Sequence, residues 1–128
     1  MEREKIHLEY LLHATSRNIL WAAISTPAGL ERWFADRVES DERTVTFGWG
    51  RSERRQAEII AMRAYSFIRF RWRDAERPRE FFELKMSYSE ITQDYVLEIT
   101  DFAEADEADD LRDLWDSQVE TLRRVCGF

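Results

Sequence analysis

Between residues 36 and 102, apolar and polar side chains alternate almost without interruption. Phe70 and Trp72 flank Arg71, for example, and the same period of two returns in one segment after another. This alternation predicts half-buried β-strands, because successive side chains of a strand point to opposite faces of the sheet. A run of such strands joined by short polar turns is typical of an antiparallel sheet with one face in solvent.

Four segments of this run, and one that precedes it, have a clear inward face. The side chains that we expect to face inward are Ile6, Leu8, Tyr10 and Leu12; Val45, Phe47 and Trp49; Ile68, Phe70 and Trp72; Phe82, Leu84, Met86 and Tyr88; and Tyr95, Leu97 and Ile99. The outer positions of neighbouring segments carry opposite charges, such as Arg69 and Glu83. Opposite charges on adjacent strands favour an antiparallel meander.

The strand expected from Arg55 to Arg63 is ambiguous, because Ile59 and Ile60 are adjacent apolar residues. If Ile59 faces inward, Arg55 and Arg63 also face inward, and an inward arginine would favour an anionic head group. If Ile60 faces inward, both arginines are exposed. The alternation itself does not decide between these alternatives.

Two short helices are predicted after the first strand. Helical spacing of apolar residues begins after Thr15 or Ser16, either of which offers an N-cap, and includes Leu20. A second helix is expected at Thr26 and Pro27, because the missing N–H of proline costs nothing at the first helical position. The two helices must therefore meet at a sharp turn.

A long helix is predicted from about Ala108 to Val125, where apolar residues form a wide stripe. Acidic residues occupy its first turns and Arg123 and Arg124 its last, which suits the helix dipole, and Gly127 lies where a C-cap glycine would. The order of elements predicts an α+β fold. In it, a curved antiparallel sheet of about six to seven strands is covered on its concave face by this helix.

The segment from Asn18 to Phe34 resembles a known family. Its Thr26-Pro27 turn, followed by a leucine and then Trp33, is similar to the helix pair of the START-like (SRPBCC, helix-grip) superfamily, close to the Aha1-type branch (activator of Hsp90 ATPase homologue). The segment Leu111 to Trp115 fits the family's long closing helix. The resemblance covers essentially the whole chain and implies one START-like domain over residues 1–128, as in small bacterial START-like proteins.

The resemblance implies a cavity between the sheet and the closing helix. Family members use it for apolar small molecules, for polyketide cyclisation or not at all, and the Hsp90-activating members use the domain for protein contact. Most candidate lining residues are aromatic, and Gln118 would be a polar anchor. The candidates are Trp33, Phe47, Trp49, Phe70, Trp72, Phe82, Met86, Tyr88, Tyr95, Trp115 and Gln118. The alternative is that these side chains simply pack as a core.

Charge and residue types narrow the function classes. The formal net charge of −7 disfavours nucleic-acid binding, which needs a basic face. Cys126 is the only cysteine, so no intramolecular disulfide forms and a reducing, cytoplasmic compartment is expected. His7 and His13 lack metal-ligand spacing, so we expect surface histidines, no metal and no cofactor. No apolar run is long enough for a membrane span.

These observations predict non-catalytic binding of a hydrophobic or aromatic, lipid-like molecule in the cavity. The alternative is a protein-interaction module of the Aha1-like co-chaperone type with a filled cavity. A cyclase or hydrolase is a weaker alternative, because the inward polar candidates are few: Tyr10, Tyr88, Tyr95 and Gln118. No catalytic residue is predicted. A monomer and a homodimer paired through an edge strand both remain open.

Overall fold

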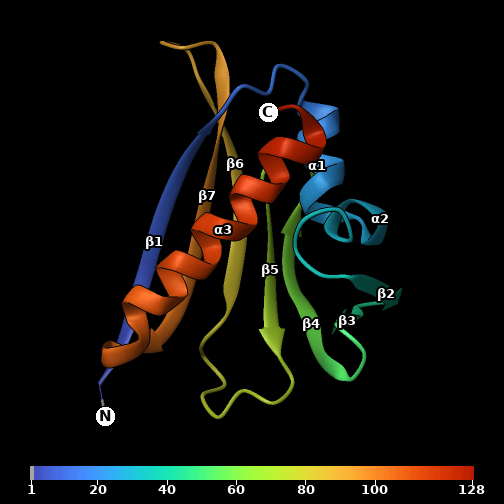
Figure 1. The fold of residues 1–128 in the computed structure, drawn as a ribbon, viewed down its shortest axis with the longest axis vertical. Coiled ribbons are helices and arrows are strands. Elements are labelled where there is room, and N and C mark those ends of the chain that lie inside the picture. Colours follow the sequence, from blue (N-terminus) through green and yellow to red (C-terminus); the bar gives the residue numbers. More distant parts are fainter. Residues whose placement is uncertain (1) are drawn as a thin grey trace.

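Seven strands form one antiparallel sheet in the computed structural model, which describes residues 2–128 (Figure 1). The strands are β1 (Arg3–Leu12), β2 (Arg37–Asp41), β3 (Thr44–Trp49), β4 (Glu53–Arg63), β5 (Phe67–Trp72), β6 (Phe82–Ser89) and β7 (Asp94–Glu104). Their spatial order is β1-β7-β6-β5-β4-β3-β2, so β1 pairs with the last strand rather than with β2. The sheet has the meander order that the alternating charges predicted.

The helices are α1 (Arg17–Ser25), α2 (Pro27–Leu30) and α3 (Ala108–Cys126), and a short 3-10 helix, η1 (Ala105–Glu107), comes before α3. Figure 1 shows α3 running diagonally across one face of the sheet, with α1 and α2 beside its C-terminal half. The predicted α+β fold, with two short helices after the first strand and a long closing helix, is therefore confirmed. No helix within residues 2–128 is long and apolar enough to cross a membrane.

The two short helices begin at the expected capping residues. The Ser16 hydroxyl accepts a hydrogen bond from the backbone N–H of Ile19, and the Thr26 hydroxyl accepts one from Gly29, at 3.3 and 3.0 Å. Gly29 is required by the close approach of α2 to α1, because a Cβ there would lie 2.0 Å from the Ala22 carbonyl oxygen. The turn between the helices is thus fixed by the Thr26 side chain, which caps α2, and by Gly29, which has no side chain to clash with α1.

A β-bulge in β4 resolves the ambiguity at the two adjacent isoleucines. Ile59 pairs with Phe70, but the next pair joins Ala61 to Arg69, so Ile60 is an extra residue. The bulge reverses the parity of the strand, because directly paired residues share a face of the sheet. Neither sequence interpretation describes the whole strand, because each gives the orientation of only one half of β4.

The bulge also determines which face of the sheet the side chains of Arg55 and Arg63 occupy. Arg55 pairs with the buried Phe47 and lies on the inward face. Beyond the bulge, Met62 pairs with the buried Ile68, so the even positions now share the face of Ile68, although Met62 itself is 57% exposed. Arg63 is exposed on the outer face. The two arginines therefore point to opposite faces of the sheet.

Six aromatic side chains fill the middle of the space between the sheet and α3. We call this set the aromatic core: Trp33, Phe34, Phe47, Phe70, Phe82 and Trp115. All six are buried, and neighbouring ring centroids lie 4.8 Å apart for Phe70 and Phe82, 4.9 Å for Phe34 and Phe47, and 5.5 Å for Phe34 and Trp115. Aromatic pairs at such distances add about 0.5–1.5 kcal/mol each to the burial of their surface.

Candidate functional site

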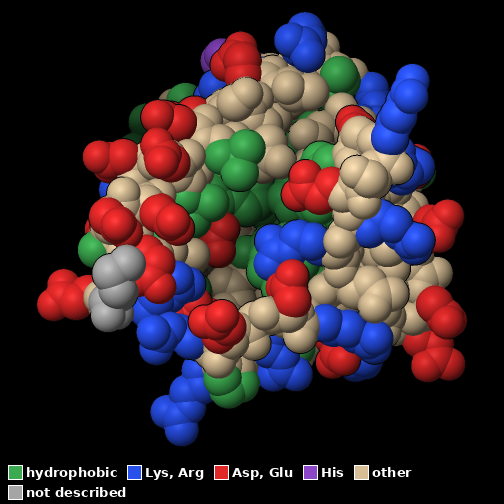
Figure 2. Space-filling model, turned by 60° about the horizontal axis from the view of Figure 1, so that its bottom comes forward, with side chains coloured by type: hydrophobic (Ala, Val, Ile, Leu, Met, Phe, Trp, Pro, Cys, Tyr) green, Lys and Arg blue, Asp and Glu red, His purple; other side chains and the backbone are tan. Residues whose placement is uncertain are grey.

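A cavity of about 640 Å³ opens at one end of the molecule, where β7 ends and α3 begins. This end is at the bottom of Figure 1, and Figure 2 shows it as a hollow with hydrophobic side chains at its depth and charged side chains around its rim. Its walls come from β1, β4, β5, the loop of residues 73–81, β7, η1 and the first turns of α3. We call it the mouth cavity.

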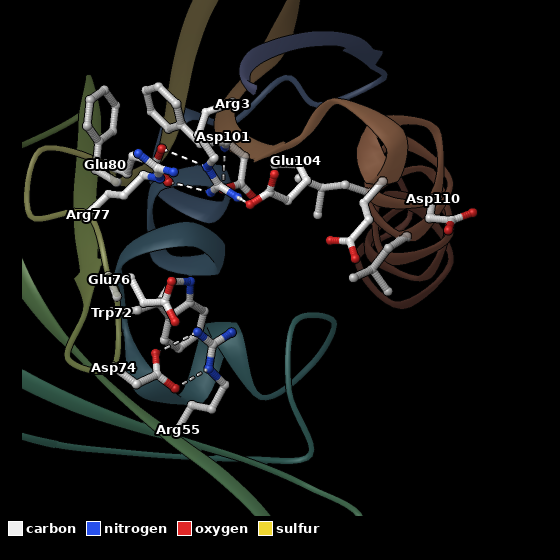
Figure 3. Close-up of a pocket in the computed structure, with 17 residues that line it drawn as sticks. Arg3, Arg55, Trp72, Asp74, Glu76, Arg77, Glu80, Asp101, Glu104 and Asp110 are labelled. Carbon is white, nitrogen blue, oxygen red and sulfur yellow. Dashed lines mark hydrogen bonds and ion pairs between the residues drawn. The ribbon is translucent and has the colours of Figure 1, made fainter. Parts of the chain in front are cut away.

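One wall is held by Arg3, which reaches two carboxylates from different parts of the chain (Figure 3). Its guanidinium donates to both carboxylate oxygens of Glu80 and lies 3.5 Å from Glu104 Oε1. The hydrogen bond to Glu80 raises the pKa of Arg3 above its usual value. The second oxygen of Glu104, Oε2, is buried and has no hydrogen-bond partner among the described residues.

The opposite wall carries a second arginine. Arg55 donates to both oxygens of Asp74, at 2.8 and 3.2 Å, and its guanidinium lies 3.9 Å from the centroid of the Trp72 ring. Hydrogen bonding to Arg55 lowers the pKa of Asp74. Trp72 in turn stacks on Phe82 at 4.9 Å, so this wall rests on the aromatic core.

Asp101 connects the mouth cavity to the aromatic core. Its Oδ2 accepts a hydrogen bond from Trp115 Nε1 at 2.9 Å, and its Oδ1 accepts one from the backbone N–H of Phe102 at 2.8 Å. Burial raises the pKa of Asp101 to about 6 even though both hydrogen bonds oppose the rise. A carboxyl group with a raised pKa therefore lines the cavity.

The lining of the mouth cavity is mixed but predominantly acidic. Three arginines face seven carboxylates, which are Asp74, Glu76, Glu80, Asp101, Glu104, Glu107 and Asp110. Trp72 and Leu111 supply apolar surface from the sheet and from α3. Such a site can hold a molecule that has an apolar part and a charged or polar group.

The predicted cavity residues lie in three environments. Buried are Trp33, Phe47, Phe70, Phe82, Met86 and Trp115; partly buried are Trp49, Trp72, Tyr95 and Gln118; exposed is Tyr88. Of this set, Trp72 lines the mouth cavity. Gln118 Nε2 donates to the Phe34 carbonyl oxygen at 3.1 Å, so the predicted polar anchor bonds to the protein backbone. Ligand contact by these residues stays a prediction.

Apart from Arg55, which one of the two interpretations of its strand placed on the inward face, sequence reasoning did not identify the charged lining of the mouth cavity. Arg3 and Glu80 are 77 residues apart, so no motif joins them. Asp101 did carry a signal, because the inward positions of β7 are odd-numbered and Ile99 is followed two residues later by this carboxylate. If the predicted inward face had been extended from Ile99 to Asp101, it would have placed an acidic group beneath α3.

A second group of titratable side chains lies on the outer face of the sheet. His7 is 3.3 Å from Glu98, and His7, Glu9 and Glu98 offer three possible metal-ligand atoms within 4.8 Å of one another. His7 and Glu9 are exposed to solvent. From the sequence, only His7 and Glu9 could be placed on a common face of one strand, because Glu98 comes from a different strand, β7.

Comparisons with known proteins agree on the fold. The sequence profile of a START-like superfamily domain matches residues 1–128. No functionally curated protein matches the sequence. A protein from Bacteroides fragilis with a known solution structure is 73% identical over 100% of this chain and 94% of its own, with a TM-score of 0.70.

Two more distant structures share the fold alone. The Aha1 dimer from Colwellia psychrerythraea is 13% identical, with 93% of this chain and 92% of the other covered and a TM-score of 0.76. CalU16 from Micromonospora echinospora is 18% identical, with 92% and 63% covered and a TM-score of 0.71. The helix-grip arrangement is therefore common to chains with little sequence in common.

Proposed function

Because the chain belongs to the START-like superfamily, we propose that it binds a small molecule in the mouth cavity without transforming it. The observation that supports this proposal is the cavity itself. Its volume of about 640 Å³ lies within the range of small-molecule sites, and its walls offer both apolar surface and charged groups. The ligand would be partly apolar, with a polar or charged end.

The packing of the interior favours this end of the fold over the middle. The aromatic core occupies the space where a fully lipid-like ligand would otherwise lie, and Phe47 and Phe70 are both fully buried. The mouth cavity stays open beside Trp72 and Leu111. The apolar part of the ligand would contact these two side chains, and its polar end would lie among the carboxylates.

Native mass spectrometry of the freshly purified protein, followed by organic extraction, tests the proposal. A Leu111→Trp variant should fill the cavity and lose the bound molecule, whereas Ile91→Trp, at a position 96% exposed, should keep it. An adduct that survives in Leu111→Trp would place the ligand elsewhere. Absence of any adduct on the wild-type protein would contradict the proposal.

The filled interior also favours a second candidate, a protein-interaction module. An interior closed by the aromatic core needs no ligand, and the first turns of α3 expose Leu114 beside several acidic residues. A stoichiometric partner that co-purifies with the chain, and that Leu114→Glu but not Ile91→Glu releases, would support this candidate. Sedimentation of the purified chain would separate such a partner from self-association.

A further inference from the structure

We infer that β1 is an interaction surface for a second copy of this chain. Two β1 strands would pair antiparallel about a twofold axis at His7, so that Lys5 of each copy lies opposite Glu9 of the other. The two sheets would then continue into one another. This inference is independent of the mouth cavity and its ligand, and it follows from the backbone groups that β1 leaves unpaired and from the charges beside them.

The two edges of the sheet differ in length. The edge formed by β2 has five residues, and a short edge strand is one means by which proteins avoid unwanted pairing. The other edge is formed by β1, which has ten residues and lies at the border of the sheet in Figure 1. Its register with β7 runs without a bulge, and it contains no proline. A long, regular edge strand of this kind is a template for another strand.

The alternation of backbone hydrogen bonds determines which residues of β1 point outward. The Glu2 carbonyl oxygen accepts a hydrogen bond from the Ala105 N–H at 3.0 Å, in the same register that joins β1 to β7. Because hydrogen-bonded and non-bonded pairs alternate in an antiparallel ladder, the even positions of β1 are those that bond to β7. The N–H and C=O groups of its odd positions therefore point away from the sheet.

The C-terminal end of the chain covers one end of this edge. Arg123 donates to the Leu11 carbonyl oxygen at 3.0 Å, and the Phe128 carbonyl oxygen accepts from the backbone N–H of His13 at 3.1 Å. Both contacts involve odd positions, as the alternation requires. Nearer the middle of β1, no hydrogen bond from elsewhere in residues 2–128 reaches the outward backbone groups of three successive odd positions, Lys5, His7 and Glu9.

The side chains at these positions are complementary to those of a second copy. Lys5 and Glu9 are exposed, and neither forms an ion pair within the described part of the chain. In a pairing about His7, Lys5 of one copy and Glu9 of the other form a hydrogen-bonded pair on both sides of the axis. Opposite charges directly across two strands stabilise the pairing.

The charges also select this register over its neighbours. A twofold axis at Lys5 or at Glu9 would place like charges directly opposite each other, which is unfavourable. An axis at Ile6 or at Leu8 would leave Lys5 without an acidic partner, because it would then face a histidine or Leu11. The axis at His7 therefore combines open backbone groups with matched charges.

A conflict within the single chain supports the same arrangement. Glu9 is directly opposite Glu98 of β7, so two carboxylates face each other across the β1–β7 pair. Lys85 is opposite Glu98 from β6, yet the two form no ion pair among the described residues. Lys5 of a second copy would bring a cation to the other side of Glu9 and offset this repulsion.

Sedimentation velocity from about 10 to about 500 µM tests the inference, and the wild type should pass from monomer to dimer across this range. Lys5→Glu and Glu9→Lys should each weaken the dimer about tenfold, because each places like charges opposite each other at two symmetric points. The double variant Lys5→Glu/Glu9→Lys should restore the affinity to within about threefold of the wild type. Arg51→Glu, in the turn between β3 and β4, changes the net charge as Lys5→Glu does and should leave the dimer unchanged.

Three results would overturn the inference: a wild type that stays monomeric throughout the range, a dimer that Lys5→Glu does not weaken, or a double variant no better than the single ones. Oxidative cross-linking then tests the register. Residues facing each other in a hydrogen-bonded antiparallel pair have Cα atoms about 5.5 Å apart, which suits a disulfide. His7→Cys should therefore form a disulfide-linked dimer, whereas His13→Cys, beyond the paired segment, should not. Equal cross-linking of the two variants would rule out an axis at His7.

Discussion

The aromatic core and the mouth cavity lie side by side under one helix, yet they are built from opposite chemistry. In the core, buried rings stack, and indole N–H groups such as that of Trp33 are bonded to the protein. In the mouth cavity, arginines and carboxylates from distant parts of the chain line an open space. The difference indicates that the sheet and α3 are held together mainly at the core, which leaves the mouth cavity free to carry charge.

The largest expected effect comes from opening the core. Phe82 is 1% exposed and contacts both the sheet and Trp115. Phe82→Ala should lower the free energy of unfolding by about 4 kcal/mol, because it removes ring burial and leaves a void. Urea unfolding measures this, with Ile91→Ala as a control that should change by less than about 0.5 kcal/mol. A loss below about 1 kcal/mol for Phe82→Ala would mean that the core is loosely packed.

The second-largest effect is expected at the hydrogen bond that joins Trp115 of the aromatic core to Asp101 of the mouth cavity. Trp115→Phe keeps most of the ring but removes the N–H that binds Asp101. The half-buried carboxylate of Asp101 would lose a donor, so the free energy of unfolding should fall by about 2 kcal/mol at pH 7.5. Trp21→Phe, at a partly buried ring on α1, should cost clearly less in the same urea assay. Equal losses would show that ring size, and not the hydrogen bond, matters.

The pH dependence of stability sharpens the comparison. The pKa of Asp101 is raised to about 6 by burial, above its unfolded value, so the native state binds the proton more tightly. Stability should therefore rise as the pH falls from 7 to 5, by about 1 kcal/mol from this group, since the charged form is the one that burial disfavours. Nearby Arg55 lowers this pKa and Glu80 raises it.

Urea unfolding of the wild type and of Asp101→Asn at pH 7 and pH 5 isolates this contribution. The difference between the two proteins should change by about 1 kcal/mol between the two pH values, with the wild type gaining at pH 5. The variant carries the contributions of all other titrating groups, so these cancel in the difference. A constant difference would show that Asp101 ionises as an ordinary aspartate.

The smallest effect is expected at the rim of the mouth cavity. The side chains of Arg55 and Asp74 are 37% and 63% exposed, so the solvent screens their ion pair. Arg55→Met should change the free energy of unfolding by less than about 1 kcal/mol, similar to Arg54→Met at the exposed neighbouring position. A loss as large as that of Phe82→Ala would make the mouth cavity part of the structural core and contradict the division proposed here.

Sequence reasoning was most reliable where the period of the pattern is strong. The inward faces of β3, β5 and β7 and the extent of α3 followed from alternation and helical spacing, and the predicted end at Val125 is one residue from the observed Cys126. The bulge in β4 could not be predicted in this way. Its position depends on the register with β5, which is not visible within β4 itself.

Whether the interior is hollow or packed could not be predicted from the alternation of side chains, for a different reason. The same inward aromatic residues are compatible with a hollow or with a packed core, and the outcome depends on where a few rings lie. Phe34 is decisive, because it follows α2 and packs against Phe47, Phe82 and Trp115 at once. The mouth cavity was harder still to predict, since most of its charged residues lie in a loop, in η1 and at the ends of strands, where no period applies.

The bulge in β4 also has an evolutionary consequence. A regular strand ties the orientation of all its side chains together, so that a shift of its register by one residue would move every inward side chain to the outer face. The extra Ile60 divides β4 into two segments of opposite phase, one with Arg55 at the mouth cavity and one with Arg63 in solvent. Natural selection can therefore alter the binding end of this strand and its far end as separate modules.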